Sequence, residues 1–221
     1  MTTTAIILAS GEGSRFGGSS SKQLAKLKDK TVVEYTLDAF EKNSNINEII
    51  LVINPKYRKE FIEMINRNSF NKICKVVDGG MTRQESSYNG VISCRPISKK
   101  ILIHDGARPF VSDRMIDDTV VALNQNEAVS VVMNSVDTLY EFDTNGSLIN
   151  IPNRSLFKRV QTPQGFRLEI IRKAHELAKN DSRTDFTDDC SMVFYYKLAS
   201  IVCVEGEEAN KKITFVDDLP E

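Results

Sequence analysis

Short runs of β-branched and other apolar residues alternate with amphipathic segments along most of the chain. This pattern constrains the fold most, because strands that alternate with helices form βα units and a mostly parallel sheet. The strands are predicted at residues 5–8, 48–53, 75–77, 100–104, 128–133 and 199–204, and the helices at roughly 32–43, 56–66, 83–94, 113–125, 167–179 and 188–196. The predicted fold class is therefore α/β, a mostly parallel twisted sheet flanked by helices.

One segment interrupts this alternation. Residues 136–152 read VDTLYEFDTNGSLINIP, with two β-prone runs on either side of Asn145 and Gly146. Asn-Gly between such runs is a strong signal for a β-hairpin. We therefore expect one domain over residues 1–221, with an inserted hairpin arm at about 136–160 that could serve a partner subunit.

Composition and charge exclude several classes of protein. The chain has 29 Lys and Arg against 30 Asp and Glu, so no net charge favours a nucleic acid or an anionic membrane as partner. The apolar run near the N-terminus has four residues, too few for a signal peptide or a membrane span. The four cysteines form no C-x-x-C pair and are expected as buried free thiols. A cytoplasmic location is expected.

The first predicted strand leads into a loop that reads LASGEGSRFGGSSSKQ. Its Gly11 and Gly13 can let backbone N–H groups approach phosphate oxygens, and Arg15 and Lys22 add positive charge. The glycine spacing differs from the G-x-G-x-x-G dinucleotide motif. Two cations in a glycine loop favour a nucleoside triphosphate, and a surface loop with solvated cations is the alternative.

Three other segments have the composition of a nucleotide site. In HDGARP, Asp105 could hold a ribose hydroxyl or a magnesium ion, and Arg108 could bind a phosphate, unless the two pair with each other. His104 is expected to be a core residue. The segments GGMTRQESS, with Gly80 and Ser86, and EANKKIT, with Lys212, follow two further strands, and Thr82 could be only a helix N-cap.

The late segment TDFTDDCS contains a cluster of carboxylates. Asp188 and Asp189 could be read as a metal site. Thr187 followed by two acidic residues also fits a helix N-cap with a favourable first turn, which is the preferred interpretation. No Ser-His-Asp or Cys-His arrangement indicates covalent catalysis.

Taken together, these segments resemble the cytidylyltransferase family that acts on 2-C-methyl-D-erythritol 4-phosphate and its sister group that acts on ribitol 5-phosphate. The matching motifs are LASGEGSRFG, KQ, DGG-x-x-R-x-x-S, HDGARPF, DT at 137–138, Arg154, QTPQGF, TDD and N-x-K-I-T at 210–214. The resemblance implies a Rossmann-like nucleotidyltransferase fold of the glycosyltransferase-A type. It also implies CTP and a polyol phosphate as substrates, magnesium as the cofactor, held mainly by the CTP phosphates with Asp105 as a possible ligand, and a homodimer through the hairpin arm.

The resemblance also implies roles for individual residues. Catalytic roles fall on Arg15, Lys22 and Lys212. Nucleotide binding falls on Ala9, Ser10, Gly11, Gly13, Gly80, Ser86, Asp105 and Gly106. Polyol-phosphate binding falls on Arg108, Thr138, Arg154 and Thr187, with Thr138 and Arg154 acting across the dimer interface.

The implied reaction needs no general base, because the acceptor phosphate is already an anion that can attack the α-phosphorus while pyrophosphate leaves. Methylerythritol phosphate is the first choice of acceptor and ribitol phosphate the alternative. An NAD-dependent dehydrogenase and a non-catalytic nucleotide-binding regulator are weaker hypotheses, since cations occupy the glycine loop.

Overall fold

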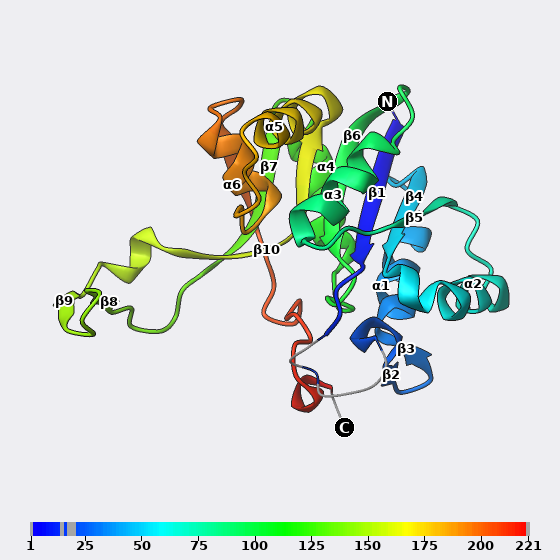
Figure 1. The fold of residues 1–221 in the computed structure, drawn as a ribbon, viewed down its shortest axis with the longest axis horizontal. Helices are drawn as coiled ribbons and strands as arrows, with labels where there is room; N and C mark the ends of the chain where they lie inside the picture. The colour runs from blue at the N-terminus through cyan, green and yellow to red at the C-terminus, as the bar shows by residue number, and fades with distance from the viewer. Residues whose placement is uncertain (1, 14–15, 17–20, 220–221) are drawn as a thin grey trace.

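The computed structural model describes residues 2–13, 16 and 21–219, and these form a central seven-stranded sheet (Figure 1). In sheet order the strands are β11 (Ile201–Glu205), β7 (Ala128–Asn134), β10 (Lys158–Arg167), β6 (Ser98–Asp105), β1 (Thr2–Ala9), β4 (Glu48–Ile53) and β5 (Ile73–Asp78). All pairs are parallel except those that β10 makes with β6 and β7. The predicted α/β class and all six predicted strands are confirmed.

The antiparallel strand β10 was not predicted. Its sequence contains the polar run QTPQGF, and a proline inside a run argues against a central strand. In the structure the register with β7 shifts between Gln161 and Gln164, so Pro163 lies where the ladder needs no N–H donor. The motif is thus part of the sheet and not a connecting loop.

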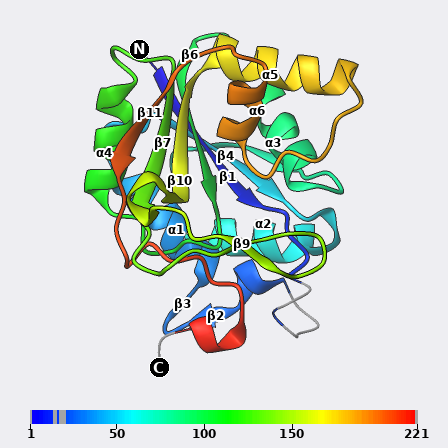
Figure 2. The same cartoon turned by 90° about the vertical axis from the view of Figure 1, so that its left-hand side faces the viewer.

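Two layers of helices cover the sheet (Figure 2). The helices are α1 (Val32–Lys42), α2 (Arg58–Arg67), α3 (Arg83–Ile92), α4 (Asp113–Ala122), α5 (Leu168–Asn180) and α6 (Asp189–Tyr195). Along β1, Ala5 and Ile7 pack with the side chains of α1, α2 and α4, whereas Ile6 and Leu8 pack with α3, α5 and α6. Because successive side chains of a strand point to opposite faces, β1 is apolar on both sides and buried between the layers.

Side-chain caps fix where the helices begin. Thr31 with Glu34 caps α1 and Thr82 with Glu85 caps α3, so Thr82 is the helix N-cap that the sequence allowed. The predicted cap at Thr187 is wrong, because Asp188 accepts the Ser191 N–H at 2.7 Å and begins α6 one residue later. A carboxylate oxygen accepts the capping hydrogen bond as readily as a hydroxyl oxygen does. Thr187 lies exposed before the helix.

The inserted arm extends away from the body of the molecule (Figure 1). Its short strands β8 (Glu141–Phe142) and β9 (Leu148–Asn150) are joined through a turn where Gly146 has a φ of +82°, a conformation that favours glycine. The predicted hairpin is therefore confirmed. Its predicted end near residue 160 is too late, because Lys158 already pairs with Asn134 in the central sheet.

The cysteines only partly match expectation. All four are free, and Cys94 and Cys190 are buried, but Cys74 and Cys203 are exposed on edge strands, where alternate side chains face solvent. Within the described parts of the chain, no helix has both the length and the apolar character that crossing a membrane requires.

Candidate active site

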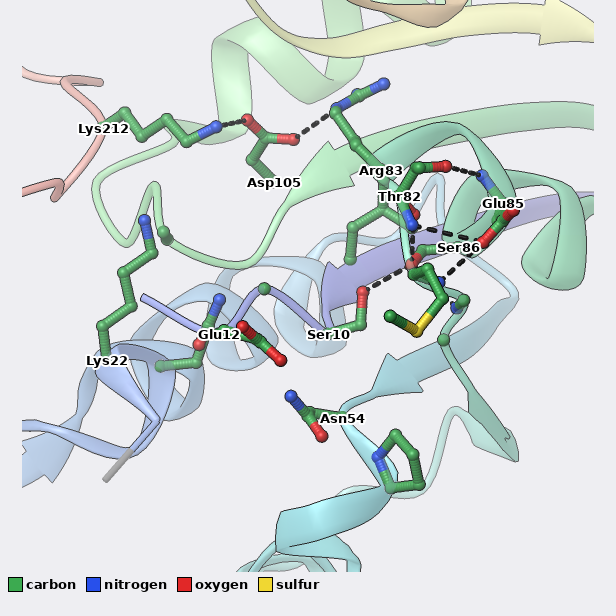
Figure 3. Close-up of a pocket in the computed structure, with 18 residues that line it drawn as sticks. Ser10, Glu12, Lys22, Asn54, Thr82, Arg83, Glu85, Ser86, Asp105 and Lys212 are labelled. Atoms are coloured by element: carbon green, nitrogen blue, oxygen red, sulfur yellow. Dashed lines mark hydrogen bonds and ion pairs between the residues drawn. The ribbon is translucent and has the colours of Figure 1, made fainter. Parts of the chain in front are cut away.

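A cleft of about 440 Å³ lies at the carboxyl ends of four adjacent strands, β6, β1, β4 and β5 (Figure 3). This edge is where open parallel sheets bind ligands. The cleft is lined by Leu8, Ser10, Gly11, Glu12, Lys22, Gln23, Asn54, Pro55, Gly79, Gly80, Met81, Thr82, Arg83, Glu85, Ser86, Asp105, Ala107 and Lys212. The four segments that the sequence singled out therefore meet in one place.

Two lysines lie at one end of the cleft. Lys22 is 8% exposed, and its Nζ donates to the carbonyl of Ile213 at 3.2 Å. Lys212 Nζ lies 2.7 Å from an Asp105 carboxylate oxygen. Gly13 has a φ of +68°, and a Cβ there would come within 3.2 Å of the Lys22 side chain, so a glycine is needed for the loop to pass Lys22. Arg15 lies outside the described residues.

Asp105 is held between two cations. One of its oxygens pairs with Lys212, and the other accepts from Arg83 Nε at 3.3 Å. Burial by itself would raise the pKa of this carboxyl, but Arg83 and Lys212 outweigh it and hold the pKa well below its usual range. Asp105 is thus ionised, and it does not pair with Arg108, which was the alternative interpretation of HDGARP.

Arg83 also reaches a second buried carboxylate. Its Nη1 lies 2.8 Å from Asp189, which is 1% exposed and also accepts from the Ser87 hydroxyl. His175 Nε2 lies 3.6 Å from the same carboxylate. Burial would raise the pKa of Asp189, but Arg83 keeps it well below the usual range. Asp188 and Asp189 therefore serve a helix cap and a buried ion pair, and the metal interpretation is not supported.

The opposite end of the cleft is formed by the turn of residues 79–82. A Cβ on Gly79 would lie 2.3 Å from the Ser10 Cβ, so this turn packs directly on the loop after β1. Ser86 joins the two, because its Oγ accepts from Ser10 Oγ at 2.8 Å and from the Gly80 N–H at 3.1 Å. Ser86 is 2% exposed and acts here as an internal connection.

Some predicted site residues support the cleft from behind. Ala9 is buried at the end of β1, and the Gly106 N–H donates to the Leu8 carbonyl at 2.8 Å. Arg108 donates to the Asn210 carbonyl at 2.7 Å and is half-buried, with its Nε buried and unpaired. None of these three lines the cleft, although Arg108 and Asn210 tie the strand ends to the segment that carries Lys212.

The predicted polyol-phosphate residues are not brought together within this chain. Thr138 and Arg154 are exposed in the arm, where Arg154 Nη1 donates to the Val136 carbonyl at 2.7 Å. Thr187 is exposed before α6. Since the arm extends away from the sheet, Thr138 and Arg154 lie outside the cleft of their own chain (Figure 1).

No role was predicted from the sequence for Arg83, Glu85 or Asn54, and Asp189 was expected only in a helix cap or a metal site. Asn54 and Pro55 follow β4 directly, so the rule used for the other strand ends would have found them. Arg83 and Asp189 are 106 positions apart, and no local pattern signals their pairing.

His104 is a core residue, as expected. It is fully buried, its Nε2 lies 3.1 Å from the Arg108 carbonyl, and its Nδ1 lies 3.0 Å from the Thr162 hydroxyl. These partners match a neutral imidazole that donates from Nε2. Burial lowers its pKa from 6.5 to about 4.

This pKa predicts a pH-dependent stability. Between pH 6.5 and 4 the unfolded chain binds a proton at His104 that the folded chain does not, so stability falls as the pH falls, by about 3 kcal/mol from this residue. Urea unfolding at several pH values should show a shallower loss for His104→Gln than for the wild type. Equal losses in the two proteins would contradict the prediction.

Comparisons with known proteins identify the family of the chain. The family model IspD, 2-C-methyl-D-erythritol 4-phosphate cytidylyltransferase, matches residues 3–221. A protein of that name from Bifidobacterium longum subsp. infantis is 36% identical over 98% of this chain and 77% of its own, and one from Clostridium botulinum (strain 657 / Type Ba4) is 37% identical over 97% and 93%.

A solved structure shares the fold. The 4-diphosphocytidyl-2C-methyl-D-erythritol synthase of Anaerococcus prevotii superposes with a TM-score of 0.88 at 30% identity, covering 99% of this chain and 92% of the other. With sequence and fold similar over nearly the full length, the chain belongs to the 2-C-methyl-D-erythritol 4-phosphate cytidylyltransferase family.

Proposed function

We propose that this enzyme transfers CMP from CTP to 2-C-methyl-D-erythritol 4-phosphate and releases pyrophosphate, with residues 1–221 acting as one domain. The observation that carries the proposal is the polarity of the cleft. Lys22 and Lys212 provide positive charge at one end, and a glycine turn with no side chain at residues 79 and 80 forms the other (Figure 3). A nucleoside triphosphate has the same polarity, with a charged tail and a flat base.

The lysines suit charge stabilisation during the transfer. An acceptor phosphate oxygen attacks the α-phosphorus, the bond from the α-phosphorus to the bridging oxygen breaks, and pyrophosphate leaves with that oxygen. The attacking oxygen is already an anion, so no proton must be removed. Lys22 and Lys212 then act by positioning the phosphates and balancing their charge, and Arg15 is proposed as a third cation.

The other nucleotide residues have supporting positions in this proposal. Ser10 and Gly11 line the cleft after β1, and Gly80 and Ser86 line it at the base end. Ala9, Gly13 and Gly106 shape the backbone beneath them.

The residues of the cleft fit magnesium held mainly by CTP. No group of three or more His, Cys, Asp or Glu residues that could hold a metal ion occurs in the part of the chain described by the structure. Mg²⁺ typically takes one or two protein carboxylates and completes its shell with phosphate oxygens and water. Asp105 would be its protein ligand, and the ion would reduce the charge repulsion between the phosphates.

A second copy of the chain is proposed to complete the acceptor site. The arm exposes apolar side chains, among them Phe142 at 55%, Ile149 at 59% and Leu156 at 78%. Apolar surface of this kind marks an interaction site. An arm that binds the partner could place Thr138 and Arg154 near the partner's Arg108 and the partner's Thr187. Within one chain these four residues are not brought together.

The dimer predicts a specific result for arm variants. A Phe142→Asp/Leu156→Asp variant should elute as a monomer near 24.9 kDa, because a buried charge opposes association. It should still bind CTP but lose transfer activity by about a hundredfold, since binding groups from the partner are lost. Ile97→Asp, at a site 60% exposed outside the arm, is the matched control. A wild-type protein that elutes as a monomer would contradict the proposal.

The function is tested by pyrophosphate release with CTP and magnesium. Reactions run in parallel with 2-C-methyl-D-erythritol 4-phosphate, with D-ribitol 5-phosphate and without acceptor should give pyrophosphate with the first alone. Release with ribitol phosphate alone would overturn the acceptor, and no release with either would overturn the function.

A further inference from the structure

Lys212 is carried by a segment that is neither helix nor strand. Residues 206–212 follow the edge strand β11 and run on irregularly toward the cleft. The backbone N–H and C=O groups of such a segment need partners from side chains or water, because no ladder supplies them. The direction in which the Lys212 side chain leaves the backbone therefore depends on the contacts that hold this segment.

The side-chain amide of Gln161, in strand β10, holds the start of the segment. Its Nε2 donates to the Glu207 carbonyl at 2.9 Å, and its Oε1 accepts from the Glu207 N–H at 3.3 Å. One side chain thus meets both backbone groups of Glu207, as a neighbouring strand would. The same Oε1 accepts from Asn210 Nδ2 at 3.2 Å, so Gln161 contacts the segment at two points.

Asn210 continues this hold toward Lys212. It is fully buried, its Nδ2 also donates to the Thr162 carbonyl at 2.9 Å, and its carbonyl accepts from Arg108 at 2.7 Å. Two residues further on, Lys212 Nζ lies 2.7 Å from the Asp105 carboxylate in the cleft (Figure 3). The hydrogen bonds of Gln161 and Asn210 thus end directly before the lysine.

The packing around the Gln161 amide leaves it no room to move. Gln161 is 7% exposed, and a Cβ on Gly206 would lie 2.5 Å from its Oε1 and 3.0 Å from Met133 Cγ. Any side chain at position 206 would therefore displace the amide. Gln161 is not among the residues that line the cleft, so an effect on the transfer must pass through the segment.

We infer that Gln161 is a positioning residue, which fixes residues 207–210 and thereby directs Lys212 into the cleft. The inference rests on the proposed function and gives the first glutamine of QTPQGF a part in the transfer. Hydrogen bonds from a buried amide to both backbone groups of one residue define its place closely. Such precision matters, because a displacement of about 1 Å at a catalytic group can lower a rate about a hundredfold.

The test is a double-mutant cycle on kcat/KM for CTP, measured by pyrophosphate release with magnesium and 2-C-methyl-D-erythritol 4-phosphate. Gln161→Met nearly keeps the length of the side chain and removes its hydrogen bonds to the segment. We expect it to lower kcat/KM by about tenfold to a hundredfold in the wild-type background. In the Lys212→Ala background it should lower kcat/KM by less than about twofold, since two residues that act through one group are not additive. A merely structural defect would lower the active fraction by the same factor in both backgrounds.

Gly206→Ala tests the same hold while Gln161 stays unchanged. The added Cβ displaces the Gln161 amide, so this variant should repeat the loss in the wild-type background and should also have little effect in Lys212→Ala. Thermal unfolding is measured beside each variant. If Gln161→Met does not fold, the result with Gly206→Ala decides.

Arg159→Met is the matched control. Arg159 lies in the same strand and contacts the same segment through Glu208 at 2.6 Å, but the two side chains are 44% and 73% exposed. An exposed ion pair fixes its partners weakly because water screens both charges. The kcat/KM of Arg159→Met should therefore stay within about twofold of the wild type.

Three outcomes would overturn the role of Gln161. These are full activity of a folded Gln161→Met variant, an equal loss in the two backgrounds of the cycle, and a loss in Arg159→Met as large as that in Gln161→Met. A wild-type protein that releases no pyrophosphate would instead overturn the proposed function.

Discussion

Lys212→Ala is expected to lower kcat/KM for CTP by about a hundredfold to a thousandfold. Removal of one group that stabilises transition-state charge typically has this effect. The fold should persist, because Asp105 keeps its ion pair with Arg83 when Lys212 is lost. Steady-state pyrophosphate release, with thermal unfolding measured beside it, checks both parts.

Lys211→Ala is the matched control, since Lys211 is the exposed neighbour and does not line the cleft. Its kcat/KM should stay within about twofold of the wild type, as expected for a surface substitution that makes no contact with the substrate. If Lys212→Ala retained full activity, Lys212 would have no part in the transfer. If both variants lost activity equally, the segment around residue 212 would matter for its conformation and not for the Lys212 charge.

Arg83→Met is expected to lower the free energy of unfolding by about 3–5 kcal/mol. Arg83 is the cation that lies between the carboxylates of Asp105 and Asp189, which are 8% and 1% exposed. Removing one partner of a buried ion pair leaves a buried charge without compensation. Here Asp189 would keep only Ser87 and His175, so urea unfolding at pH 7 should show the loss.

Arg58→Met supplies a control with nearly the same geometry at the surface. Arg58 pairs with Asp78 at 2.7 Å, and these side chains are 46% and 49% exposed. An exposed pair contributes about 0–1 kcal/mol, because water screens both charges. Equal losses of unfolding free energy in Arg83→Met and Arg58→Met would show that burial does not decide how much these ion pairs contribute to stability.

The sequence contained enough information for most of the sheet. The strands at residues 48–53 and 128–133 are apolar except for Glu48 and Ser130 because both faces are covered by helices, and such runs are easily recognised. Strand β10 could not be found in this way. Its polar residues make specific contacts, such as Gln164 Nε2 with Asp188 and Gln161 Nε2 with the Glu207 carbonyl, and these depend on residues far away in the chain.

The same distinction applies to the cleft. Lys22, Asp105 and Lys212 could be predicted because Asp105 ends a strand and the two lysines follow strands that end at the same edge of the sheet. The bonds that hold them could not, since Arg83 meets Asp189 only when α3 and α6 pack on the same face. The arm illustrates the limit most clearly: Asn145 and Gly146 identify the turn, but the direction of the arm depends on the fold around it.

A crystal structure with CTP and magnesium tests the proposed function most directly. We expect the triphosphate between the Nζ atoms of Lys22 and Lys212, and the cytosine against the turn at residues 79–82. A nucleotide bound in the opposite direction, with its phosphates at the turn, or bound outside this cleft, would contradict it.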